Sequence, residues 1–201
     1  MCASRPFIFL TAVLFSLFCQ STLGQTNNEQ AFYLYEDSAK KLTGEAANEL
    51  FRKGGFVKAA GNELNVGFTR SVFWLAYQHD HDIPGDSLLL YIGHHHINRI
   101  HFYFIKDSIV KQQWLTGDYF PFAQRPVNAT GFYFPINKKG IYLARIDKSN
   151  ESLQLSFELV SPIQALSAES DNKSVMALLT GIVLLMIIFG TYLFAISGEK
   201  V

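Results

Sequence analysis

The sequence predicts an all-β fold, a β-sandwich with one short helix near its N-terminus, preceded by a signal peptide and followed by a single transmembrane helix. Short apolar segments with a period of two recur between residues 72 and 160, and turn-forming residues separate them. Many short strands at regular spacing are typical of a sandwich. An apolar segment near each end of the chain predicts an export signal and a membrane anchor.

Residues 1–24 are predicted to be a secretory signal peptide. Arg5 supplies the positive charge of the n-region, and the apolar run Phe7–Phe18 is short for a membrane span. Small residues at positions 22 and 24 favour cleavage before Gln25. An uncleaved signal anchor remains the alternative.

Both cysteines of the chain, Cys2 and Cys19, fall in this signal segment. Cys19 would suit a lipoprotein, but Phe18 is bulky where the processing site requires a small residue. The mature chain contains no cysteine, so the exported domain must be stable without disulfides and must bury a sizeable core.

Residues 25–160, the predicted exported domain, have the usual size of one domain. Removal of Arg5 with the signal peptide leaves 16 basic and 17 acidic residues, which gives no sign of nucleic acid as a partner. The aromatic content of 14% is high, as is common in β-rich cores and in sugar-binding faces.

The first predicted elements are a strand at Phe32–Glu36 and the only helix, Leu42–Arg52, which ends at a pair of glycines. Val72–Gln78 is apolar on both faces, as a central strand would be. Ile83–Asp86 contains Pro-Gly-Asp and predicts a turn. Ser87–Ile92 is therefore expected to pair with Val72–Gln78 as the second arm of a hairpin.

Five further strands follow the same period. They are expected at Ile97–Ile105, Ile109–Trp114, Phe132–Ile136, Ile141–Ile146 and Leu153–Val160. The last has the clearest pattern, because Leu153, Leu155 and Phe157 alternate with polar residues along it.

The C-terminal region contains the predicted membrane anchor. Residues 161–173 are polar and are expected to tether the sandwich to the membrane. Residues 174–197 form the predicted transmembrane helix, in which the 22 residues Val175–Ile196 carry no charge and span about 33 Å. The signal peptide places the sandwich outside the membrane and residues 198–201 in the cytoplasm.

All six histidines lie between positions 79 and 101. Imidazole is a common metal ligand, which makes His94 and His96 the candidates for a metal site. In the expected hairpin, however, His79 faces Leu90 and His94 faces Leu75, so the two histidine groups lie about 13 Å apart along the ladder. One ion needs its ligand atoms about 2 Å away, so neither a metal site nor a cofactor is expected.

No enzymatic activity is expected. No serine lies in a nucleophile elbow, and the mature chain has no cysteine nucleophile. The sequence also does not bring two carboxylates to the spacing that a glycosidase needs.

The segment Trp114–Pro126 carries the candidate ligand-binding residues. They are Trp114, Asp118, Tyr119, Phe120 and Arg125. Aromatic faces stack on sugar rings, and Asp or Arg side chains hydrogen-bond to hydroxyls or carboxylates. In the alternative interpretation, Asp118 and Arg125 form an ion pair that braces the loop, while Phe120 fills the core. The two roles are equally supported for Tyr119 and Arg125, and bracing is favoured for Asp118.

Three stretches of the chain carry a family resemblance. They are Leu64–Leu75, Gly93 with Ile97–Phe104, and the loop that contains Thr116-Gly117-Asp118, Pro121-Phe122 and Arg125-Pro126. Through them, residues 31–160 resemble the type 2 extracellular domain of the bacterial seven-transmembrane receptors with diverse intracellular signalling modules. The loop motif is the most specific of the three.

The resemblance implies a jelly-roll-like β-sandwich related to carbohydrate-binding modules. It also implies a periplasmic sensor that passes its ligand state through seven helices to a cytoplasmic signalling module. The chain departs from the family pattern at Ala76, where the family often has an arginine, so any role of that arginine is absent. Six of the seven helices are missing too, so we expect a truncated receptor or a chain that works beside a partner.

The expected function is therefore that of a membrane-anchored ligand-sensing domain of a signal-transduction receptor. We expect it in the bacterial inner membrane as a single-pass protein with a periplasmic sandwich. Its expected ligand is a carbohydrate or other small solute, and other membrane helices or a signalling protein are the expected partners. The alternative is a non-catalytic interaction protein that docks a periplasmic or membrane partner.

Overall fold

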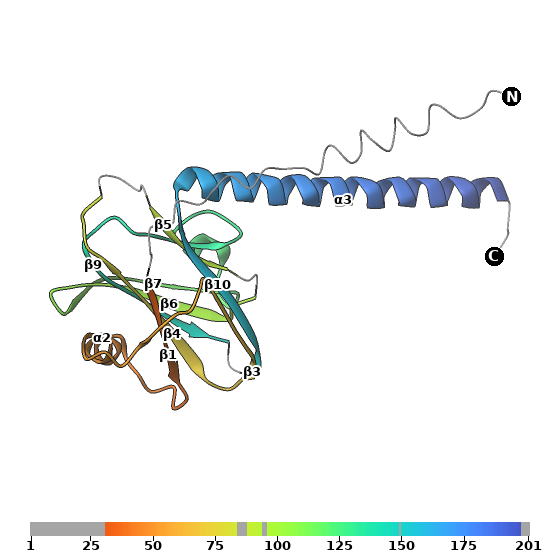
Figure 1. Cartoon of the computed structure of the whole chain (residues 1–201). Helices are drawn as coiled ribbons and strands as arrows, with labels where there is room; N and C mark the ends of the chain where they lie inside the picture. Colours follow the sequence, from red (N-terminus) through yellow and green to blue (C-terminus); the bar gives the residue numbers. More distant parts are fainter. Residues whose placement is uncertain (1–30, 84–87, 94–95, 149, 198–201) are drawn as a thin grey trace, which may run out of the picture. The chain divides into compact units, whose positions relative to one another are not determined.

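The computed structural model describes residues 31–83, 88–93, 96–148 and 150–197, which form ten strands, two α-helices and one 3₁₀ turn (Figure 1). The predicted signal peptide, the cytoplasmic tail and His94 lie outside these residues. All eight predicted strands are present, each within two residues of its predicted bounds.

The strands form two antiparallel sheets. The six-stranded sheet has the order β2 (Val57–Lys58), β1 (Phe32–Asp37), β4 (Val72–His79), β9 (Gly140–Asp147), β6 (Arg99–Lys106) and β7 (Ile109–Thr116). The four-stranded sheet has the order β3 (Glu63–Thr69), β10 (Glu151–Val160), β5 (Leu89–Gly93) and β8 (Phe132–Pro135). The other elements are α2 (Gly44–Arg52), the 3₁₀ turn η1 (Phe122–Gln124) and α3 (Pro162–Ser197).

The two sheets pack face to face through one shared apolar core. Phe102 of β6 stacks on Phe134 of β8 with ring centroids 4.1 Å apart, and Phe32 of β1 meets Phe157 of β10 at 5.0 Å. Such ring pairs join one sheet to the other, because each pair takes one member from each. The described residues therefore form an all-β sandwich.

Strand β4 is buried on both faces, as its apolar sequence predicts. Its second face is covered by α2, which lies within the predicted helix range and packs Ala47 against the six-stranded sheet. Trp74 is fully buried in this second cluster, stacked 6.0 Å from Tyr103. Trp74 is thus a core residue.

The predicted hairpin between Val72–Gln78 and Ser87–Ile92 is wrong. β4 pairs with β1 and β9 in one sheet, whereas β5 pairs with β10 and β8 in the other. The segment between them carries the chain across the sandwich, and turn-forming residues do not specify whether the next strand stays in the same sheet. His79 accordingly lies opposite Gly140, not opposite Leu90.

Two observed strands, β2 and β3, have no counterpart among the predicted ones. β3 is an edge strand, and most of its residues are exposed, including Val66 and Phe68. Strands with so little buried surface lack the alternation by which a strand is recognised.

The segment predicted as a polar tether is helical. Helix α3 begins at Pro162, with only Ser161 between it and the end of β10, and contains 36 residues. Ser161 and Gln164 form a capping box: Gln164 N donates to Ser161 Oγ at 3.2 Å, and Ser161 N donates to Gln164 Oε1 at 2.8 Å. Proline is favoured at the first helical position, so this sequence starts the helix directly at the end of the strand.

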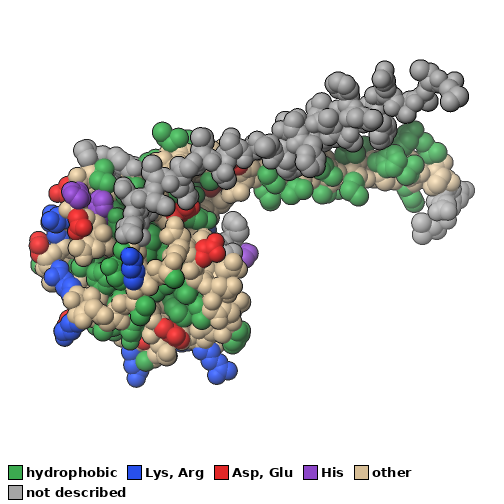
Figure 2. All heavy atoms as spheres, viewed as in Figure 1, with side chains coloured by type: hydrophobic (Ala, Val, Ile, Leu, Met, Phe, Trp, Pro, Cys, Tyr) green, Lys and Arg blue, Asp and Glu red, His purple; other side chains and the backbone are tan. Residues whose placement is uncertain are grey.

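The later part of α3 is long and apolar enough to cross a membrane. Its most apolar stretch has a mean hydropathy of 2.4, and none of that stretch is buried against the rest of the chain. Hydrophobic side chains cover this part of the helix in Figure 2. A continuous exposed apolar helix of this length is the expected form of a membrane anchor.

The first turns of α3 pack on the outer face of the four-stranded sheet. Ala165 joins a small buried cluster with Leu89 of β5, Tyr133 of β8 and Ala129 of the preceding loop. The start of the membrane helix is therefore part of the folded head, which also explains why a polar segment is ordered there.

This cluster predicts a loss of stability at alkaline pH. Burial, and then the nearby Tyr91, Glu169 and Glu158, raise the pKa of Tyr133 to about 12 from an ordinary value of 10.0. The contribution of Tyr133 is therefore fully present below about pH 10 and is lost as the pH rises towards 12. Chemical denaturation between pH 10 and pH 12 measures this loss of unfolding free energy. We expect the loss to be smaller in Tyr133→Phe than in the unchanged protein. Tyr119→Phe, a change at an exposed tyrosine, is the control and should show the same loss as the unchanged protein.

Candidate functional site

Backbone hydrogen bonds hold the loop that follows β7, which we call the Asp118 loop (residues 117–126). Asp118 N donates to Ile97 O at 2.9 Å, and Tyr119 N donates to Asn98 O at 3.2 Å. Ile97 is fully buried, so these bonds fix the loop against a rigid part of the connection to β6. The loop is thus a defined surface at one end of the sandwich.

The close approach of these two segments requires glycine at position 117. Gly117 has φ +132, and a Cβ there would meet the carbonyl oxygen of Asn98 and lie 2.8 Å from Arg99 Cα. Gly117→Ala is therefore expected to lower the free energy of unfolding by about 2 kcal/mol through backbone strain and overpacking. Gly61→Ala, which meets nothing within 4 Å, is the matched control in thermal denaturation. Equal stabilities of the two variants would contradict this account of the loop.

Arg125 braces the loop from within. Its side chain is only 12% exposed and lies between two rings, 4.7 Å from the centroid of Phe122 and 4.4 Å from that of Phe132. Its Nη1 donates to the carbonyl oxygens of Ala129, at 3.0 Å, and of Thr130. The guanidinium is thus saturated by groups of the protein on most sides, which assigns it a structural role.

Asp118 connects Arg125 to the surface. Its Oδ1 lies 3.8 Å from Arg125 Nη2, and its Oδ2 lies 3.5 Å from Nδ1 of His96. His96 is 84% exposed and Asp118 is 29% exposed, so both can contact a solute. The expected ion pair between Asp118 and Arg125 is present, and His96 joins it, which the sequence spacing did not indicate.

The other candidate residues of the loop do not converge. Trp114 packs against the core, with its ring 5.8 Å from Phe102. Phe120 lies under the guanidinium of Arg99, 5.8 Å away. Of these candidates, Tyr119, at 70% exposed, presents an aromatic ring to solvent, and the ring of Phe122 in the same loop is 49% exposed. Tyr119, Phe122, Asp118 and His96 are therefore among the accessible groups of the described residues at this end.

The histidines do not assemble a metal site in the part of the chain that the structure describes, where no group of three or more His, Cys, Asp or Glu side chains is placed to hold an ion. His79 Nδ1 lies 3.2 Å from the hydroxyl of Tyr77, and His101 Nδ1 lies 2.7 Å from that of Tyr103. Burial lowers the pKa of both histidines, so both rings are neutral near pH 7.

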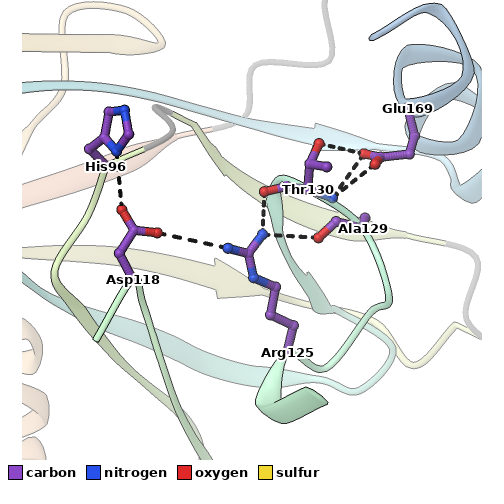
Figure 3. A network of polar contacts seen from close by, with 6 residues as sticks. All are labelled: His96, Asp118, Arg125, Ala129, Thr130 and Glu169. Atoms are coloured by element: carbon purple, nitrogen blue, oxygen red, sulfur yellow. Dashed lines mark hydrogen bonds and ion pairs between the residues drawn. The ribbon is translucent and has the colours of Figure 1, made fainter. Parts of the chain in front are cut away.

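The Asp118 loop is linked to helix α3 through Thr130 (Figure 3). Thr130 N donates to both carboxylate oxygens of Glu169 at 3.0 Å, and Thr130 Oγ1 donates to Oε2 at 2.9 Å. Glu169 belongs to α3 and is only 5% exposed. Since Thr130 O also accepts from Arg125, a continuous chain of polar contacts runs from His96 and Asp118 to α3.

A cleft of about 570 Å³ lies at the opposite end of the six-stranded sheet, beneath α2. In β6 and β7, Ile100 pairs with Thr116 near the Asp118 loop, and Lys106 pairs with Ile109 near this cleft. Its lining residues come from β1, α2, β4, β6 and β9 and from the connections beside these elements. They are Tyr33, Phe51, Arg52, Gly54, Phe56, Gln78, His79, Asp80, Ile105, Lys106, Asp107, Lys139, Gly140 and Ile141. Their scatter along the chain explains why no sequence motif indicates the cleft.

Comparison with known proteins places the sandwich in a family. The family model described as 7TMR-DISM extracellular 2 matches residues 29–161, about two thirds of the chain. The match ends at the start of α3, so it covers the head without the apolar helix. A search of curated proteins finds no match.

Proposed function

This chain belongs to the 7TMR-DISM extracellular 2 family, and on that premise we propose that its sandwich is the ligand-sensing domain of a membrane-anchored signal-transduction receptor. We place it as a single-pass protein of the bacterial inner membrane, exported by its N-terminal segment, with the sandwich in the periplasm. Its ligand is a carbohydrate or other small solute, in line with the jelly-roll-like relation to carbohydrate-binding modules that the resemblance implies.

One observation carries this proposal: the polar chain from Asp118 through Arg125 and Thr130 to Glu169 of α3. A sensor must connect the surface that meets its ligand to the element that enters the membrane. Each contact in this chain is a direct hydrogen bond or ion pair, and the side chains of Arg125 and Glu169 are largely buried. Ligand contact at the exposed end can therefore act on the position of the helix.

The loop offers chemistry suited to a polar solute. Tyr119 presents a ring face, and Asp118 and His96 present hydrogen-bonding groups beside it on the same loop system. Aromatic stacking combined with carboxylate hydrogen bonds is the usual way in which proteins hold sugar rings.

The test is a binding screen of the full chain in nanodiscs against neutral and charged sugars and small solutes, read by thermal shift and calorimetry. For a solute that binds, we expect Tyr119→Ala to weaken the affinity about tenfold, the equivalent of about 1.4 kcal/mol. Phe68→Ala is the matched control, because Phe68 is 68% exposed on β3, outside the loop. A folded chain that binds no member of the panel, but recovers one stoichiometric protein partner, would support an interaction protein instead.

A further inference from the structure

The cleft beneath α2 is lined by more cationic than acidic side chains. Arg52, Lys106 and Lys139 line it, and a neighbouring cleft of about 560 Å³ shares Lys106 and adds Lys111 and Lys138. Within the described ranges, none of these five side chains forms an ion pair. Three carboxylates face the same clefts, those of Asp80, Asp82 and Asp107. Cations therefore outnumber carboxylates here, in a chain whose formal net charge is zero.

The rim of the cleft is held in place without using these ammonium groups. Lys139 N donates to Asp82 Oδ1 at 2.7 Å through its backbone, and Tyr142 Oη bonds to the backbone of Lys138. Asp80 accepts from Gln78 Nε2 at 3.0 Å, so part of its hydrogen-bonding capacity is used. The lysine side chains are thus carried on a fixed backbone and remain available to a ligand.

His79 supplies a second and independent sign of a ligand. Its ring lines the cleft and is 9% exposed, and Nδ1 is bonded to Tyr77. Its Nε2 is buried and has no hydrogen-bond partner among the described residues. Buried polar atoms are nearly always paired in native proteins, so the unpaired nitrogen of a ring that lines the cleft is a candidate partner for a ligand group.

An aromatic wall faces these polar groups. Phe51 lies between Tyr33 and Phe56 at ring-centroid distances of 5.4 Å from each, with edge-to-face geometry, and all three rings line the cleft. Rings that pack edge to face offer an apolar surface for the face of a cyclic solute. The volume of the cleft also suits a small molecule.

We propose that this basic cleft, defined by Arg52, Lys106, Lys139, His79 and the Tyr33–Phe51 wall, binds a small organic anion of monosaccharide size. Its carboxylate or phosphate group pairs with Lys106 and Lys139, and its ring and hydroxyls meet the aromatic wall and His79. The inference goes beyond the proposed sensor function, because it assigns an acidic solute to a second site, separate from the Asp118 loop.

The experiment is calorimetry on the full chain in nanodiscs of zwitterionic lipid. The probes are glucuronate and glucose 6-phosphate, with glucose as the neutral control of the same size and inorganic phosphate as the bare anion. We expect at least one of the two anionic sugars to bind ten times more tightly than glucose and inorganic phosphate. Its binding should weaken as salt concentration rises.

The variant is Lys106→Gln with Lys139→Gln, both of which are exposed, so the fold is expected to tolerate the change. It should weaken binding of the anionic sugar at least tenfold. Lys41→Gln with Lys148→Gln removes the same charge away from the cleft and should leave the affinity unchanged.

The outcomes separate this inference from the proposed function. Equal affinity for glucose and the anionic sugars, or an anion affinity that the Lys106 and Lys139 changes do not alter, would overturn it. The absence of any binding by the anionic sugars would do the same. Binding of neutral sugars that depends on Tyr119 alone would leave the sensor proposal standing while removing this one.

Discussion

Arg125→Ala is expected to lower the free energy of unfolding by about 3 kcal/mol, more than other single changes in the Asp118 loop. The change removes charge-assisted hydrogen bonds to the carbonyl oxygens of Ala129 and Thr130 and two cation–π contacts, with Phe122 and Phe132. It also leaves Asp118 without its cation. Because Phe132 begins β8, the damage extends from the loop into the core. Chemical denaturation of the full chain in micelles measures it.

Two variants make the test specific. Arg125→Lys keeps the charge but lacks the planar guanidinium that bonds to two carbonyl oxygens. We therefore expect it to retain less than half of the unfolding free energy that Arg125→Ala loses. Arg70→Ala removes an exposed arginine from the turn before β4 and should change stability by less than about 0.5 kcal/mol. If Arg125→Ala is no more destabilising than Arg70→Ala, Arg125 does not brace the loop.

Glu169→Ala is expected to release the first turns of α3 from the head, at a cost of about 3 kcal/mol. The buried carboxylate accepts three hydrogen bonds from Thr130, and its loss leaves the Thr130 N–H without a partner in a partly buried position. Hydrogen exchange of residues 162–173 should rise markedly, because their protection depends on docking to the sandwich as well as on the helix itself.

Glu169→Gln and Ser167→Ala complete this experiment. The glutamine keeps the volume, but turns an amide donor towards the donors of Thr130, so we expect an intermediate effect. Ser167 is exposed on the same helix, and Ser167→Ala should leave exchange unchanged. A double variant of Glu169→Ala with Thr130→Ala should be less destabilising than the sum of the single changes. Unchanged exchange in Glu169→Ala would show that the contact does not hold the helix.

Eight of the ten described strands were predictable, because each of these eight carries its own signal. In β10, alternate residues enter the core, and in β4 both faces are buried, so the sequence itself shows which backbone is extended. The pairing of strands was not predictable by the same means, because β4 finds its partners β1 and β9 at distant positions. The turn-forming residues between β4 and β5 predict that the chain reverses direction, but they do not determine which sheet β5 joins.

The sequence contains a signal for a helix start at Pro162, although residues 161–173 read as a polar tether. Ser161 and Gln164 stand at the spacing of a capping box, with proline between them at the first helical position. The low hydrophobicity of the next residues outweighed that signal. Only Ala165 and Glu169 of these turns are buried, and a single alanine with one glutamate does not produce a recognisable apolar face.

The candidate site divided in a similar way. The ion pair between Asp118 and Arg125 could be predicted from their charges and their closeness in the sequence. The bracing role of Arg125 could not, because its acceptors are backbone carbonyls, which every residue type has. His96 reaches Asp118 only because the connection before β6 is bonded to the loop. The residues of the basic cleft come from five elements and the loops beside them, so no local sequence pattern predicts the cleft.

The docking of Glu169 onto Thr130 sets how deep the head sits at the bilayer. Val175, the first residue of the apolar run, is six residues further along α3, a rise of about 9 Å. The headgroup layer on each side of a bilayer is of similar thickness, about 5–8 Å. With Val175 at the hydrocarbon boundary, Glu169 and Thr130 therefore lie close to the outer edge of the lipid headgroups. Ion concentrations at this surface are then set by the charge of the lipids, so the lipid composition of the membrane becomes a variable in every measurement of ligand binding.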